Sequence, residues 1–585
     1  MPRLHTILGA LAVTLVAAHA PEAAACGCFA MSSPATPVVQ AGERILFAHE
    51  NDQVTAYIQI KYQGAADQFG WIVPLPSVPT LELGTDELFS ALDVTTLPQY
   101  LLTRTNQFCG GGSSTTVDDN GGGCGAFGSN NASTGRGGFA DQGVAAGSSD
   151  MGRSNVAVVQ ASIGPYDYAV LKADDESAML KWLNDNRYFV PTGTMDAVKP
   201  YIHAGGYFLA LKLRGGQSSG DVAPIVLRYA SDLPMIPITL TQVGAVPNMG
   251  ILVWVLSEAR AVPRNYYHVV LDDLPVWFSN FADYNQQLIA AVKEAPGRHG
   301  FLTQYAGDSN VMSGRLDYPG RFGNLDSLRT LSAPSDYLHQ LRSSGFTFDG
   351  TLVAILSRYI PEPQKLVDQG ISLGQFYAQF DYYSQLPGGG GGDPDGGAAL
   401  FTPGPLTDEL AMRIVTPAKN AAALIGRHPY LTRLYTALSP EDMTIDPVFS
   451  FNPDLPAVPL AHTATVTTPC SGAPWLHTDL GFETQYVSGL PPQSLKLPAA
   501  LRVELLRDAG APAPVVDNSD GIRTLLGTVS YGSMNSPTSP GAANHGGGCG
   551  CTVGGGRVRS NVAVLFALAG AALGLRRWRR RRARS

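Results

Sequence analysis

Two short segments carry the G-x-S-x-G spelling of a serine nucleophile elbow, the turn that presents a reactive hydroxyl in many hydrolases. They lie at residues 216–220 and 370–374. An elbow needs a strand before the serine and a helix after it. The first segment leads from one expected strand into another, and the second has a helical stretch on both sides. Both are therefore predicted to be ordinary turns, and the sequence names no catalytic residue.

Histidines are the residues most often used for proton transfer and metal binding, but in the body of this chain they occur singly. None has a second histidine or a cysteine two to four residues further on. They are His49, His203, His268, His299, His339, His428, His462 and His477. We therefore expect no metal and no cofactor. A site assembled from distant residues, such as His49 with a spatially close aspartate or serine, stays open, because such sites converge in space rather than in sequence.

Two acidic turns place carboxylates beside a glycine, as calcium loops do. They are residues 393–396 (DPDG) and 517–521 (DNSDG). Neither follows the twelve-residue order of an EF-hand, and neither supplies its final glutamate. We expect solvated turns, with calcium binding as a weaker hypothesis.

The body contains five cysteines that are candidates for disulfide bonds: Cys26, Cys28, Cys109, Cys124 and Cys470. Cys109 and Cys124 bracket a segment of Gly, Ser and Asn, and a bridge between them would close a loop of about 15 residues, worth on the order of 3 kcal/mol. That pairing is the preferred one. Cys26 and Cys28 are left to pair with Cys470, to bridge each other, or to leave one thiol for acylation. Zinc is not expected, because neither Cys109 nor Cys470 has a close partner.

Both ends of the chain have the features of targeting segments. Arg3 precedes an apolar run from Ile7 to Ala18 and a series of alanines, which together form the parts of a secretory signal peptide over residues 1–25. At the other end, an apolar stretch at 562–575 is followed by seven arginines within residues 576–584. The stretch is short of the roughly 20 residues that cross a bilayer comfortably. It is well suited to a transient stop, because the arginines resist translocation.

The order of small residues with Cys549 and Cys551, an apolar helix and an arginine cluster resembles the Myxo-CTERM sorting tail of exported bacterial proteins. In that family an intramembrane sorting protease processes the tail, and a cysteine of the motif is the essential, lipid-bearing position. Cys549 and Cys551 both qualify, and Cys551 is slightly favoured because Thr552 follows it. The resemblance implies a sorting protease and a lipid membrane as partners, and a location at the cell surface or outer membrane.

The elements of the body are predicted from periodicity. Residues 43–62 alternate as a β-hairpin should, and residues 69–76 end in prolines that suit an edge strand. Asp174, Asp175 and Glu176 mark a helix start. Helical stretches are expected at 281–295, 336–342, 362–383 and 407–438. The paired aromatics at 266–267, 277–278 and 382–383 are expected to fill a core.

Several motifs of the body together resemble a domain of unknown function found in exported actinobacterial and myxobacterial proteins. The motifs are Cys26-Gly27-Cys28, the hairpin, residues 69–76 (FGWIVPLP), 173–174 with 180–183, 223–225 and 234–237. The likeness covers about residues 26–275, with continuity to about 460. It implies no activity and no catalytic residue.

The composition limits the function classes. Charged residues make up 15 % of the 585, and nine of the 40 basic residues are arginines in the last 29 positions. The body is therefore acidic, and nucleic acid is not an expected partner. We expect an α+β fold with a β-rich N-terminal half, covering helices and a more helical C-terminal half. The boundaries are a domain at 26–275 with an insertion at 109–155, a mixed region at 276–510, a stalk at 511–548 and the tail at 549–585.

Three functions remain. The first is a non-enzymatic surface protein for adhesion, envelope organisation or ligand capture, its ligand unknown. The second is a surface hydrolase built from scattered residues, which requires a polar pocket with histidine and a carboxylate. The third is calcium-dependent binding.

Overall fold

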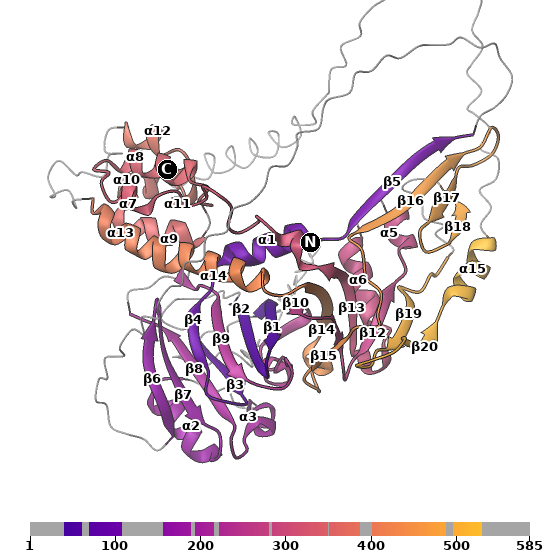
Figure 1. The fold of residues 1–585 in the computed structure, drawn as a ribbon, viewed down its shortest axis with the longest axis horizontal. Helices are drawn as coiled ribbons and strands as arrows, with labels where there is room; N and C mark the ends of the chain where they lie inside the picture. Colours follow the sequence, from indigo (N-terminus) through magenta and orange to yellow (C-terminus); the bar gives the residue numbers. More distant parts are fainter. Residues whose placement is uncertain are drawn as a thin grey trace, which may run out of the picture. The chain divides into compact units, whose positions relative to one another are not determined.

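The computed structural model describes residues 40–60, 69–107, 156–188, 194–215, 221–279, 283–348, 350–386, 401–486 and 495–528. Within them a ten-stranded mixed sheet has the order β20-β19-β12-β13-β14-β10-β1-β2-β9-β4 (Figure 1). Its strands are β1 (Gln40–Glu50), β2 (Gln53–Ile60), β4 (Thr80–Leu83), β9 (Ile225–Ala230), β10 (Ala245–Ser257), β12 (Tyr267–Leu271), β13 (Gly300–Asp308), β14 (Tyr430–Leu438), β19 (Ala500–Leu505) and β20 (Ala513–Asp517). The sheet therefore draws strands from both sides of the boundary expected at residue 275.

The hairpin expected at 43–62 is confirmed by β1 and β2. Asn51 and Asp52 form its two-residue turn with φ of 52° and 57°, between the paired residues Glu50 and Gln53. Two consecutive left-handed residues match the right-handed twist of the flanking strands, and Asn and Asp tolerate that conformation better than most residues. On its other side β1 pairs in parallel with β10, whose run Ile251–Leu256 is apolar as a central strand requires.

Three smaller sheets accompany the large one. One has the order β3-β8-β7-β6, a second has β18-β17-β16-β5, and a third consists of β11 and β15. Their strands are β3 (Gly70–Leu75), β6 (Ala157–Ile163), β7 (Tyr166–Lys172), β8 (Tyr207–Leu213), β5 (Gln99–Asn106), β16 (Ala461–Thr468), β17 (Trp475–Thr478), β18 (Glu483–Gln485), β11 (Arg260–Pro263) and β15 (Phe449–Asn452).

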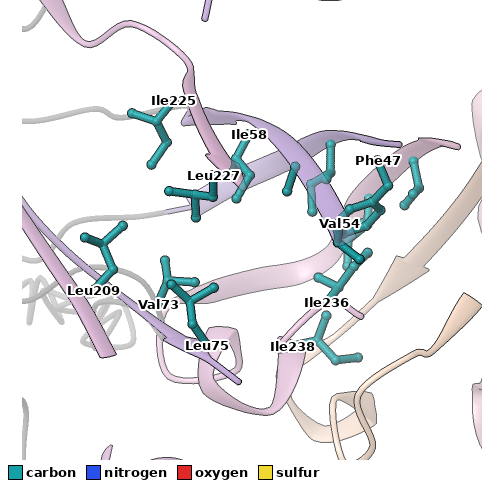
Figure 2. Close-up of a cluster of buried hydrophobic side chains, with 14 of the residues drawn as sticks. Phe47, Val54, Ile58, Val73, Leu75, Leu209, Ile225, Leu227, Ile236 and Ile238 are labelled. Carbon is teal, nitrogen blue, oxygen red and sulfur yellow. The ribbon is translucent and has the colours of Figure 1, made fainter. Parts of the chain in front are cut away.

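The main apolar core lies between the large sheet and the sheet of β3, β6, β7 and β8. Figure 2 shows Ile58 and Leu227 of the large sheet near Val73, Leu75 and Leu209 of the smaller one. All five side chains are buried. Burial of such side chains contributes roughly 1.5–3 kcal/mol each, so the facing sheets are held together mainly by the hydrophobic effect.

Helices become more frequent in the later part of the chain, as expected, and the α+β class is confirmed. They are α1 (Asp86–Thr96), α2 (Glu176–Asp185), α3 (Thr194–Val198), α4 (Ile238–Thr241), α5 (Leu274–Phe278), α6 (Tyr284–Lys293), α7 (Leu325–Leu328), α8 (Pro334–Ser343), α9 (Gly350–Tyr359), α10 (Gln364–Asp368), α11 (Leu373–Ala378), α12 (Phe380–Ser384), α13 (Pro403–Leu410), α14 (Thr416–Ile425) and α15 (Ser519–Gly527). Helices α7 to α13 share a second apolar core. Asp175 caps α2, as its acidic start predicts.

Two expectations about elements are wrong. Residues 430–438, expected within a helical stretch, form β14, because this segment pairs on both sides with β10 and β13. Residues 513–527, expected within a stalk, form β20 and α15, because β20 pairs with β19 and α15 buries Ile522 and Leu526. Tyr382, expected in a core, is 61 % exposed, whereas the expected burial of Tyr266, Trp277 and Phe278 is confirmed.

Arg433 of β14 ties the large sheet to α1 and to the region of the site described below. Its guanidinium donates to Asp93 Oδ1 at 3.1 Å and to Thr96 Oγ1 at 3.0 Å, both on α1. Its Nε donates to Gln304 Oε1 at 2.8 Å, and Gln304 donates in turn to the hydroxyl of Tyr284 at 2.9 Å. This series of hydrogen bonds fixes the side chains of Gln304 and Tyr284, which line the cavity described below, to the central strand β14.

No helix among the described residues is long and apolar enough to span a membrane. The apolar stretch at 562–575 lies outside the described residues, as do the signal segment 1–25, the insertion 109–155 and the tail 549–585.

Candidate functional site

A cavity of about 470 Å³ opens beside strands β12, β13 and β19 of the large sheet and strands β5 and β16 of a smaller one. Figure 1 shows β12 beside β19 and β5 beside β16, although the members of each pair are far apart in the sequence. The volume lies in the range of small-molecule sites. The ionisable and phenolic side chains in its wall are Tyr100, Arg260, His268, Asp273, Tyr284, His462, Asp479, Arg502 and Glu504.

Four of these residues form one hydrogen-bonded group, which we call the arginine cluster: Arg260, His268, Arg502 and Glu504. His268 Nδ1 lies 3.2 Å from Glu504 Oε2, and its Nε2 lies 3.3 Å from Arg260 Nη2. A guanidinium only donates, so Nε2 must accept and the ring proton must sit on Nδ1, facing Glu504. The geometry therefore holds His268 as one neutral tautomer.

The electrostatics of the cluster agree with that tautomer. Burial lowers the pKa of His268, and the nearby charge of Arg260 lowers it further, against the effect of Glu504. Burial acts to raise the pKa of Glu504, but hydrogen bonds from His268 and Arg502 outweigh it and lower that pKa. The cluster thus holds two guanidinium cations and one carboxylate, an excess of one positive charge.

Arg260 is the most deeply placed cation of the cavity wall. Its side chain comes from β11, is 5 % exposed, and donates to the carbonyl of Pro456 at 3.0 Å and to Thr303 Oγ1 at 3.3 Å. Among the described residues it forms no ion pair with a carboxylate, and its Nε has no hydrogen-bond partner. Burial lowers its pKa. An isolated buried charge is costly, so this arginine favours an anion nearby.

A second group lies where β16 meets the end of β12, and we call it the histidine dyad: His462 with Asp273. His462 Nδ1 lies 2.8 Å from Asp273 Oδ2, and the hydroxyl of Tyr100 donates to Asp273 Oδ1 at 2.8 Å. The ring of His462 also stacks on Tyr100, with centroids 4.7 Å apart. Both oxygens of Asp273 are engaged, so the imidazole is held in one orientation.

The dyad leaves one nitrogen for chemistry. Nε2 of His462 forms no hydrogen bond with any residue that the structure describes, and the side chain is 24 % exposed. Burial acts to lower the pKa of His462, but the hydrogen bond and the charge of Asp273 outweigh it and raise that pKa. A histidine held in this way can exchange a proton with a molecule in the cavity.

Asp272, adjacent to the dyad, is fully buried. Its Oδ1 accepts from the backbone N–H of Leu274 at 3.0 Å, and its Oδ2 has no partner among the described residues. Burial raises the pKa of Asp272 to about 7. Burial thus favours the protonated form of Asp272, which carries no charge beside Asp273.

The residues singled out from the sequence do not form this site. Ser372 caps α11 and exchanges hydrogen bonds with Gln375 in a capping box, so the serine of the second G-x-S-x-G segment lies at the start of a helix that no strand precedes. The first one, at 216–220, lies outside the described residues. His49 stacks on Phe451 with centroids 5.2 Å apart, and its Nε2 has no partner in the described part of the chain. The structure shows no hydrogen bond between His49 and an aspartate or serine of the described residues.

The cysteines and the acidic turns also lie away from the cavity wall. Cys470 is disulfide-bonded, and its backbone N–H and sulfur lie 3.4 Å and 3.9 Å from oxygens of Gln107. Cys26, Cys28, Cys109, Cys124, Cys549 and Cys551 lie outside the described residues, as does the turn at 393–396. The turn at 517–521 begins α15, where Asp517 Oδ1 accepts from the N–H of Ser519 at 2.9 Å. The described ranges contain no group of three ligands that would hold a metal.

Sequence reasoning missed the site because its partners are far apart in the chain. His462 and Asp273 are separated by 189 positions, and His268 and Glu504 by 236. No local spacing connects residues at such separations. The one available signal was the requirement stated for a hydrolase, a polar pocket in which a histidine meets a carboxylate.

The fold and cavity define an α+β protein with a pocket whose wall carries several ionisable side chains, and comparison with known proteins gives its family. The family model described as "Uncharacterized protein conserved in bacteria (DUF2330)" matches residues 20–343, more than half of the chain. The chain belongs to this family. The matched region contains Tyr100, Arg260, His268 and Asp273, while the other half of the cavity wall follows it in the sequence. No curated protein and no solved structure matches the chain.

Proposed function

We propose that this protein is exported, anchored at the cell surface or outer membrane through its C-terminal tail, and binds a small ligand in the cavity described above. The observation that carries the binding function is the cavity itself, because it combines about 470 Å³ of space with charged groups fixed by hydrogen bonds. Such preorganised polar groups in a concave site orient a ligand and give it specificity. Nucleic acid is not an expected ligand of so acidic a body.

The test is native mass spectrometry of the full protein extracted from its own cells in mild detergent. We expect one small molecule bound per chain, released on unfolding. Protein that carries no such molecule, and that gains none after incubation with an extract of the same cells, would contradict the binding function.

The proposed anchoring depends on the tail and has a separate test. Replacing both Cys549 and Cys551 by alanine should remove the protein from the cell surface, because the motif resembles a tail in which a cysteine is the processed, lipid-bearing position. Replacing Ser539 and Asn544, which lie shortly before the two cysteines, by alanine is the matched control and should leave surface labelling unchanged. Surface labelling that persists in the double variant would contradict this mode of anchoring.

A surface hydrolase is the second candidate, and the histidine dyad is the observation that favours it. In this function His462 Nε2 would take a proton from water, the hydroxide would attack the substrate carbonyl, and the same proton would pass to the leaving group. Turnover of ester or peptide substrates should then be lost in His462→Gln and kept in His477→Gln, a half-exposed histidine paired with Glu483 on the next strand. No turnover by the full protein, or turnover that survives His462→Gln, would exclude it.

A further inference from the structure

Two oppositely charged side chains in the cavity wall have unused capacity for a ligand. The first is Arg502 of β19. Its Nε donates to Glu504 Oε1 at 2.8 Å, which fixes the side chain, and its side chain is 36 % exposed. Its Nη1 and Nη2 form no hydrogen bond with any residue that the structure describes. These two nitrogens make the planar fork with which arginine binds a carboxylate.

The second is Asp479, which follows β17. Its Oδ2 accepts from the backbone N–H of Thr463 at 2.8 Å, so the side chain is held in place. The residue is exposed, and in the described ranges it forms no ion pair. Asp479 therefore presents a carboxylate oxygen that can accept from a cationic donor.

The surroundings strengthen each charge. Around Arg502, the arginine cluster carries an excess positive charge, and buried Arg260 has no carboxylate partner among the described residues. Around Asp479, the dyad contributes the charge of Asp273. Both carboxylates act to raise the pKa of His462. One end of the cavity thus favours an anion and the other favours a cation.

The separation of the two ends follows from the strand register. Arg502 pairs with Val270 on β12, and Asp273, bonded to His462, lies three residues further along the same chain. Asp479 contacts Thr463, the residue after His462. Three residues of chain span at most about 10 Å, and Asp273 itself has helical backbone angles, φ −78° and ψ −12°. An extended tripeptide spans the same length between its ammonium and carboxylate groups.

We propose that the ligand of this cavity is a short zwitterionic peptide of about three residues, with its carboxylate on Arg502 and its ammonium group beside Asp479. This inference rests on the proposed binding function and names the class of its ligand. A neutral saccharide leaves the Nη1 and Nη2 atoms of Arg502 and the carboxylate of Asp479 without a charged partner.

The test uses the full protein and a mixture of tripeptides of varied side chains in three forms: free, N-acetylated and C-amidated. In native mass spectrometry the protein should retain free tripeptides. Either blocked form should bind at least about tenfold more weakly, because each loses one charge-assisted contact. Since all three forms meet the unaltered protein, this comparison does not depend on a variant that folds.

Variants then assign each contact. Arg502→Gln should weaken the free form while the amidated form binds as before, and Asp479→Asn should weaken the free form while the acetylated form binds as before. Arg214→Gln is the matched control, an exposed arginine after β8 outside the cavity, and should change nothing. Equal retention of the three peptide forms, or no retention of the free form, would overturn the inference. A neutral native ligand bound in the cavity would also overturn it while leaving the binding function intact.

Discussion

Glu43 gives a prediction in which the magnitude follows from the structure. It lies on β1 with its side chain 6 % exposed, and its Oε2 has no partner among the described residues. It borders a small apolar cavity that Trp71 also lines. Burial raises the pKa of Glu43 from 4.5 to about 7. The folded protein therefore binds this proton more tightly than the unfolded chain does.

The sign of the pH effect follows from that difference. Protonation of Glu43 stabilises the fold fully below about pH 4.5, and this contribution is lost as the pH rises through about 7. A difference of about 2.5 pKa units corresponds to about 3 kcal/mol. Glu43→Gln removes the charge at constant shape, so its free energy of unfolding at pH 8 should exceed that of the parent protein by up to about 3 kcal/mol.

Urea unfolding between pH 4.5 and 8.5, followed by tryptophan fluorescence, measures this difference, and Trp71 reports from beside the substituted side chain. The advantage of Glu43→Gln should shrink steadily as the pH falls and vanish near 4.5. Glu50→Gln, at the exposed end of the same strand, should show no such trend. An advantage that is independent of pH, or a loss of stability at pH 8, would refute the reasoning.

Two further predictions concern the stability and covalent structure of the body. Arg413 is 2 % exposed and donates to Asp221 at 2.7 Å and to Glu409 at 3.1 Å, so Asp221→Asn leaves this buried cation with Glu409 as its charged partner. The substitution should lower the free energy of unfolding by on the order of 1–3 kcal/mol, measured by urea unfolding, and an unchanged midpoint would contradict this. Cys470 lies two residues past Thr468, whose carbonyl accepts from Gln107 at 2.8 Å, and Cys109 lies two residues past Gln107. Non-reducing peptide mapping should therefore find Cys109 linked to Cys470, whereas a link between Cys109 and Cys124 would restore the pairing that loop length favours.

The sequence predicted those elements whose signal is local. The alternation of apolar residues in 54–60 and the turn residues Asn51 and Asp52 sufficed for the hairpin, because one buried face and a two-residue turn specify it. The acidic start of α2 was predicted equally well. The segment 430–438 was not, since its pattern suits either a helix or a strand, and pairing with β10 and β13 decides between them.

The site was beyond local reasoning for a related reason. A lone histidine has the same sequence environment whether it lies on the surface or in a site, and His462 differs from His49 only in what the fold brings to it. His462 lies opposite Tyr100 in the parallel pairing of β16 with β5, and both side chains hydrogen-bond to Asp273. Arg502 and Glu504 reach His268 through the antiparallel pairing of β12 with β19.

Both proposed functions require that the cavity beside β12 holds a ligand. A crystal structure of the protein isolated from its own cells would show whether it does. We expect an ordered molecule in the cavity with an anionic group at the Nη1 and Nη2 atoms of Arg502. A cavity filled only by water, in protein that was never exposed to denaturant, would contradict it.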